Sequence, residues 1–141
     1  MKYSKSGSVN AAFIDFSAQL PKYVREMTYS ASQIEEACTQ IRAAMRKPPI
    51  TESDDNVIRQ GLMENILRRD MNLLLAGVVR VKRSLLESVR ILRDSSQKVL
   101  AAYDAHREGS TESSLAMERA EVEFAESYKM LIELEVRLSC D

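Results

Sequence analysis

The residue best suited to proton transfer in this 141-residue chain is its single histidine, His106. It lies in the segment AAYDAHREGS, with Asp104 two positions before it and Glu108 two positions after it. A general base needs a second group that orients it and a pocket that receives a substrate. Residues one or two positions apart on a helix do not face each other, so neither carboxylate is placed to orient the ring. We therefore interpret His106 and Arg107 as cations that complement the carboxyl end of a helix.

Metal-binding and nucleophilic chemistry find little support in the other residue types. Glutamates are frequent at 34–37, 117–126 and 132–135, but a di-iron bundle takes a Glu-x-x-His motif from two helices, and the chain has one histidine. Cys38 and Cys140 lie far apart with no Cys-x-x-Cys spacing, which argues against a zinc site. No phosphate-binding loop and no Gly-x-Ser-x-Gly elbow is present. The sequence therefore predicts no enzyme, no catalytic residues, no metal site and no cofactor.

The elements that would position any site are helices. Residues 10–46 repeat large apolar side chains every seven positions, and mostly small residues follow each of them by three. The large set is Phe13, Leu20, Met27, Ile34 and Ile41. Pro21 interrupts this pattern, because a proline inside a helix removes one backbone hydrogen bond and clashes with the preceding turn. We predict either a kink at residues 17–21 or a first helix that ends near Leu20, with a second that begins at Pro21.

A linker at residues 46–55, RKPPITESDD, separates this pattern from the next. Its two prolines are expected to end the first helix, and Ser53 or Asp54 can cap the second by accepting backbone N–H groups. The second pattern runs over residues 55–107, where an unbroken helix would be about 80 Å long. One apolar row repeats at seven, and a companion row adds Leu67, Leu74 and Val81. The first row comprises Met71, Val78, Leu85, Leu92 and Val99.

The third pattern covers residues 114–139 and follows a turn in which Gly109 is placed like the glycine that ends a helix. Its heptad row comprises Met117, Phe124, Leu131 and Leu138. The predicted fold class is all-α, an elongated helical hairpin or bundle of three to four long antiparallel helices with coiled-coil-like packing, in one domain over residues 1–141. The middle helix outruns the others and its apolar stripe is wide, so we expect self-association as a dimer or larger, or a protein partner.

The charges fit pairing between helices better than a nucleic-acid surface. Net charge is −1, and no aromatic residue alternates with the basic ones of the second helix. These basic residues are Arg68, Arg69, Arg80, Lys82, Arg83, Arg90, Arg93 and Lys98. We expect them to complement the third helix, where residues 112–126 carry five glutamates against Arg119 alone. A helical nucleic-acid-binding or regulatory protein that uses this arginine-rich part is kept as an alternative.

Neither a membrane span nor a cleaved signal is predicted. The chain has no run of about 18 apolar residues. The start of the chain, MKYSKSGSVN, is basic but has no apolar segment behind it. We expect a cytoplasmic protein, or one exported without a cleaved signal peptide.

Residues 9–108 form a long helix, a loop and a second long helix that ends in LAAYDAHRE. In this arrangement the chain resembles the small helical-hairpin proteins of type VII (ESX-like) secretion. The resemblance implies four-helix dimers, no cleaved signal, and a Tyr-x-x-x-Asp/Glu tail. Here KPPIT stands in place of the family's Trp-x-Gly turn, and Arg107 stands four positions after Tyr103 with Glu108 one position later. Helical export chaperones of the type III and flagellar systems share the architecture.

The sequence therefore predicts a non-enzymatic helical protein–protein interaction module. It would be a secretion-associated substrate or the partner of one, or alternatively a cytosolic export chaperone or adaptor. No small-molecule substrate is indicated. The predicted partner-binding residues lie on the wide stripe of the second helix and on the heptad face of the first. They are Leu75, Val78, Val79, Leu86 and Val89, together with Met27, Ile34 and Ile41.

Overall fold

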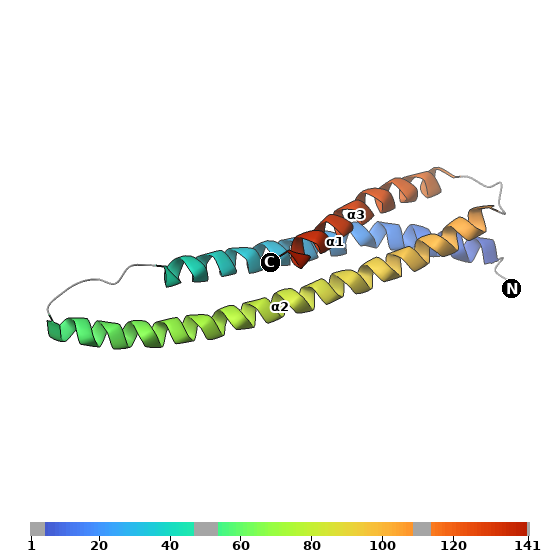
Figure 1. The fold of residues 1–141 in the computed structure, drawn as a ribbon. Helices are drawn as coiled ribbons and strands as arrows, with labels where there is room; N and C mark the ends of the chain where they lie inside the picture. Colours follow the sequence, from blue (N-terminus) through green and yellow to red (C-terminus); the bar gives the residue numbers. More distant parts are fainter. Residues whose placement is uncertain (1–4, 47–53, 109–113, 141) are drawn as a thin grey trace. The chain divides into compact units, whose positions relative to one another are not determined.

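A computed structural model describes residues 5–46, 54–108 and 114–140 of the chain (Figure 1). These residues form three α-helices: α1 at Lys5–Met45, α2 at Asp54–Glu108 and α3 at Leu115–Ser139. No strand occurs in the described ranges, so the predicted all-α class is confirmed. The helix bounds lie within one residue of the predicted ones except at the start of the first helix, which begins five residues earlier. The linker residues Pro48, Pro49 and Ser53 and the predicted turn residue Gly109 lie outside the described residues.

Pro21 lies inside α1, which continues through it from Lys5 to Met45. The alternative in which one helix ends near Leu20 and another begins at Pro21 is therefore wrong, and three helices rather than four are present in the described residues. A proline costs a helix one hydrogen bond. Leu20 and Val24, at 0% and 1% exposure, are fully buried on either side of it. We attribute the continuity of α1 to this burial, because tertiary packing supplies most of a helix's stability in a folded protein.

The three helices divide into two compact units. The first unit contains α1 as far as Tyr29, α2 from Leu85 onward, and the whole of α3. The second unit is Ser30–Ser84, which contains the remainder of α1 and the first part of α2.

The first unit is a three-helix bundle in which α2 runs antiparallel to α1 and α3. Arg90 of α2 pairs with Glu135 of α3, and Arg107, later on α2, pairs with Glu121, earlier on α3. The two helices therefore run in opposite directions. α3 runs parallel to α1: the Phe13 ring lies 5.4 Å from that of Phe124, and residues 18–25 share a pocket with residues 123–130. Buried residues on α3 follow each other by three and four positions alternately, as expected for a helix packed along one seam. They are Met117, Ala120, Phe124, Ser127, Leu131, Leu134 and Leu138, which confirms the predicted apolar row of this helix.

Capping fixes where α3 begins. The Ser114 hydroxyl accepts a hydrogen bond from the backbone N–H of Met117 at 3.2 Å. Such a cap satisfies one of the donors that the first turn of a helix leaves without a partner. The boundary of α3 is therefore set locally, by one serine.

The second unit is a hairpin of two helices, and the α2 side chains in it are less buried than those in the first unit. Ala31, Ile34 and Cys38 of α1 are buried there. Among the described side chains of α2 from residue 59 to residue 84, none is buried. A hairpin of two helices thus leaves much of this part of α2 in water.

Candidate functional site

His106 and Arg107 both lie in the last turn of α2. His106 is half-buried, and its Nε2 atom is buried without a hydrogen-bond partner among the described residues. Asp104, the nearest acid before it in the sequence, is exposed. The described geometry therefore gives the ring no orienting carboxylate of the kind that a general base needs.

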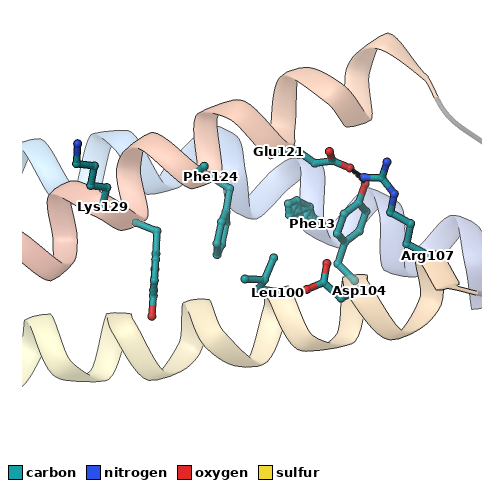
Figure 2. Close-up of a pocket in the computed structure, with 10 residues that line it drawn as sticks. Phe13, Leu100, Asp104, Arg107, Glu121, Phe124 and Lys129 are labelled. Atoms are coloured by element: carbon teal, nitrogen blue, oxygen red, sulfur yellow. Dashed lines mark hydrogen bonds and ion pairs between the residues drawn. The ribbon is translucent and has the colours of Figure 1, made fainter.

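A cavity of about 380 Å³ lies close to this end of α2 in the first unit (Figure 2). Two pairs of stacked rings form much of its wall. The Phe13 and Tyr103 rings have centroids 3.8 Å apart, and the Phe124 and Tyr128 rings have centroids 5.7 Å apart, with an interplanar angle of 11° in both pairs. Its charged lining residues are Asp104, Arg107, Glu121 and Lys129.

The carboxylate of Glu121 in this cavity is already engaged by two donors from α2. The Tyr103 hydroxyl donates a hydrogen bond to Glu121 Oε1 at 2.7 Å, and the Arg107 guanidinium forms an ion pair with the same oxygen. Figure 2 shows Arg107 reaching across to Glu121 from the neighbouring helix. These groups hold α2 against α3, so Tyr103, Arg107 and Glu121 are already engaged in contacts within the bundle.

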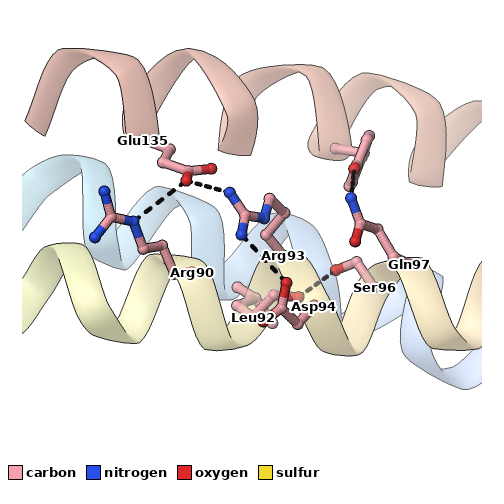
Figure 3. A network of polar contacts seen from close by, with 8 residues as sticks. Arg90, Leu92, Arg93, Asp94, Ser96, Gln97 and Glu135 are labelled. Atoms are coloured by element: carbon pink, nitrogen blue, oxygen red, sulfur yellow. Dashed lines mark hydrogen bonds and ion pairs between the residues drawn. The ribbon is translucent and has the colours of Figure 1, made fainter. Parts of the chain in front are cut away.

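A second polar network joins α2 to α3 farther along the bundle (Figure 3). Arg90 Nε lies 3.4 Å from Glu135 Oε1, and the Arg93 guanidinium donates to the same carboxylate oxygen and to Asp94. The hydrogen bond that Arg93 donates to Glu135 raises the pKa of the Arg93 guanidinium above its ordinary value, and the one that it donates to Asp94 adds to this effect. The network ties two cations of α2 to one carboxylate of α3.

The prediction that basic residues of α2 complement acids of α3 is confirmed in part. Arg90 and Arg93 of the predicted set pair with Glu135. Glu121 pairs with Arg107, which was not in that set. Glu121 lies in the predicted acidic segment 112–126, whereas Glu135 lies beyond it. Within the described residues, no group of three or more histidine, cysteine, aspartate or glutamate side chains is arranged to hold a metal ion. None of the described helices combines the length and apolar character needed to cross a membrane.

Most of the predicted partner-binding residues pack within the chain itself. Val89 is fully buried in the first unit, and Ile34 is 7% exposed in the second, so neither offers a free surface in this fold. The others are half-buried: Leu75, Val78, Val79, Leu86, Met27 and Ile41. The structure therefore does not bring the predicted set together on one open face.

The apolar side chains that do remain in water lie on a different face of α2. Seven large ones in the second unit are 50–63% exposed: Leu62, Met63, Ile66, Leu67, Leu73, Leu74 and Val81. Sequence reasoning assigned Leu67, Leu74 and Val81 to a companion row of the packed stripe and so missed them as a surface. The signal was present in the second row of heptad spacing, but the sequence did not show which row faces α1.

We define the α2 seam as the six residues on this face that follow each other by four and three positions alternately: Met63, Leu67, Asp70, Leu74, Gly77 and Val81. This is the spacing of residues that contact one partner helix along a coiled-coil seam. Asp70 is its one charged member. Ile66 and Leu73 flank the seam and widen its apolar surface.

A groove of about 510 Å³ opens beside the α2 seam, between α2 and α1 of the second unit. From α2 it is lined by Leu73, Leu74, Gly77, Val78 and Val81, and from α1 by Gln33, Ile34 and Ala37. Gln33 is the only residue with a polar side chain in this set. A small-molecule site needs a few polar groups that fix the ligand's orientation. This groove is better suited to apolar side chains that enter from another helix.

Comparison of the chain with protein-family models, with curated proteins and with solved structures gave no match. The resemblance to type VII secretion proteins therefore stays a prediction, and function has to be inferred from the chain's own surfaces.

Proposed function

We propose that this protein is a non-enzymatic helical protein–protein interaction module that binds through the α2 seam. The observation that carries the proposal is the row of large apolar side chains left in water on one face of α2. The largest apolar patch on a typical monomer covers about 300–600 Å², and larger patches mark sites of association. Seven side chains with at least half of their surface exposed reach or exceed this range.

The spacing of the seam indicates a helix as the partner. Positions that alternate by four and three keep one side of a helix facing a second helix over several turns. Burial of one leucine-sized side chain contributes about 1.5–3 kcal/mol, and association costs about 4–15 kcal/mol in lost freedom. One or two such side chains would not offset this cost. The seven on this face are 50–63% exposed, so their complete burial would contribute about 5–13 kcal/mol, which is comparable with the cost.

Two roles inferred from the sequence fall within this class. A secretion-associated substrate would leave the cell, whereas an export chaperone or adaptor would remain in the cytoplasm. Detection of the protein in culture medium and in washed cells distinguishes them, with a cytoplasmic enzyme as the lysis control. Both roles need the same exposed surface, so the proposal for the class is independent of this result.

Site-specific photo-crosslinking in the producing cells tests the proposal. A photoreactive phenylalanine derivative is introduced at Leu74, on the seam, and in a matched variant at Asn72, which is exposed two positions away. We expect a crosslinked protein species from position 74 and little or none from position 72. Equal products from the two positions, or none from position 74, would overturn the proposal.

A further inference from the structure

We propose that the occupant of the α2 seam is a second copy of this chain, with the two α2 helices antiparallel and a two-fold axis beside Leu73. This inference rests on the proposed function and names the partner of the same surface.

The exposed area is of the order that a symmetric dimer needs. A standard interface buries about 800 Å² on each partner. Seven large apolar side chains at 50–63% exposure together offer a surface on the order of several hundred Å². In a two-fold interface each copy contributes the same patch, so one surface of this size is covered by its own duplicate. No second apolar partner surface is required.

Asp70 sets the direction of the pair. In a parallel, in-register pair each residue faces its own copy, which would bring two Asp70 carboxylates together within an apolar seam. Like charges in such a contact are strongly unfavourable. An antiparallel pair separates them and places Asp70 of one copy opposite Leu74 of the other. A single polar residue at a core position is also a known means of fixing register at some cost in stability.

The register follows from pairing all six seam residues. With the axis beside Leu73, Met63 faces Val81, Leu67 faces Gly77 and Asp70 faces Leu74, each across the interface. A shift of one heptad in either direction would leave seam residues without a counterpart. In this register the flanking Ile66 meets the aliphatic part of Arg80, whose charged group can stay in water.

Gly77 provides the space that this register requires. A Cβ atom built at Gly77 would meet no atom within 4 Å, so the helix surface is open there. Gly77 also lines the groove between α2 and α1. A large side chain opposite a glycine fills such a space, and Leu67 of the second copy is the residue that the register places there. The glycine and the leucine are thus complementary in volume.

Sedimentation velocity of the purified chain over a range of concentrations tests the pairing. We expect a dimer for the native chain, and for Leu74→Glu a dissociation constant raised at least 100-fold, since the new carboxylate would replace an apolar side chain and face Asp70 of the other copy. Asn72→Glu adds the same charge at an exposed position off the seam and should remain dimeric. Far-UV circular dichroism checks that both variants keep the native helix content. A native chain that is monomeric throughout, or a dimer unaffected by Leu74→Glu, would overturn the inference.

Crosslinking with a short bifunctional maleimide tests the register. Cys140 is exposed, so the substitutions are made in a Cys140→Ser background, which also serves as the blank. Leu73→Cys should crosslink to its own copy. Met63→Cys should not, because its two copies would lie about 27 Å apart along the helix axis, but it should crosslink when mixed with Val81→Cys. Efficient self-crosslinking of Met63→Cys would overturn the antiparallel arrangement.

Failure of this inference and failure of the proposed function give different results. A monomeric chain that still yields a crosslink to a different protein from position 74 in cells rejects the second copy as occupant and keeps the interaction module. A monomeric chain that yields no crosslink rejects both.

Discussion

The Phe13 ring of α1 is stacked on the Tyr103 ring of α2, with centroids 3.8 Å apart and planes 11° from parallel. Both residues are 1% exposed. The Phe124 ring of α3 lies 5.4 Å from that of Phe13, so this aromatic cluster joins all three helices of the first unit. Aromatic side chains bury more apolar surface than any others, and we therefore expect the cluster to dominate the stability of this unit.

Replacement of Phe13 by alanine should lower the free energy of unfolding by about 3–5 kcal/mol, because it removes a buried ring and leaves a cavity. Tyr23→Ala is the matched control, since Tyr23 lies on the same helix and is 44% exposed. Urea unfolding followed by circular dichroism measures both changes. A loss at Phe13 no larger than the loss at Tyr23 would contradict the assigned core.

Replacement of Glu135 by glutamine should lower the melting temperature by a few degrees, because Arg90 and Arg93 both lose their ion pair with α3. The difference from the native chain should shrink in 1 M salt, which screens such pairs. Glu133→Gln, two positions away at an exposed site, should have little effect. Equal melting temperatures for the two variants at low salt would argue against the network.

Replacement of His106 by leucine should stabilise the chain by about 1 kcal/mol, since a buried polar atom without a hydrogen bond carries a penalty of this order. His106→Gln keeps a polar side chain at the same place and should not give this gain. Urea midpoints compare the two variants. A large loss of stability in His106→Leu would show that Nε2 has a partner that stabilises the fold.

Gly61 and Gly77 of α2 form a matched pair, because a Cβ atom at either position meets nothing within 4 Å in the described chain. Alanine at either position should therefore stabilise α2 by about 0.5–1 kcal/mol when the chain is monomeric. Only Gly77→Ala should also weaken the dimer, because the new methyl group enters the space that Leu67 of the second copy would fill. Sedimentation of both variants checks this, and equal dissociation constants would contradict the role given to Gly77.

Much of this fold could be predicted from apolar spacing alone. The alternation of three and four positions in α3, from Met117 to Leu138, identified the residues that the structure buries. The continuity of α1 through Pro21 could not be predicted, because it depends on burial of Leu20 and Val24 against other helices, and local sequence does not encode those contacts.

The candidate surface was predicted less well than the fold. The first part of α2 carries two apolar rows, and spacing alone does not say which row faces α1. The structure half-buries Met71, Leu75 and Val78, and leaves Leu67 and Leu74 in water. The residues expected to bind a partner were thus largely those that pack within the chain. The stripe is wider than one partner helix can cover, but its width alone does not show which residues stay exposed once α1 has packed against α2.

A single tryptophan placed on the α2 seam tests the central claim most directly, since the chain has none of its own. Leu74→Trp is compared with Asn72→Trp by acrylamide quenching of fluorescence over a dilution series. The account predicts that the residue at 74 is shielded in concentrated protein and becomes as accessible as the residue at 72 on dilution, as the two copies separate. Equal and full quenching of both at every concentration would show that the seam stays in water, and would contradict the account.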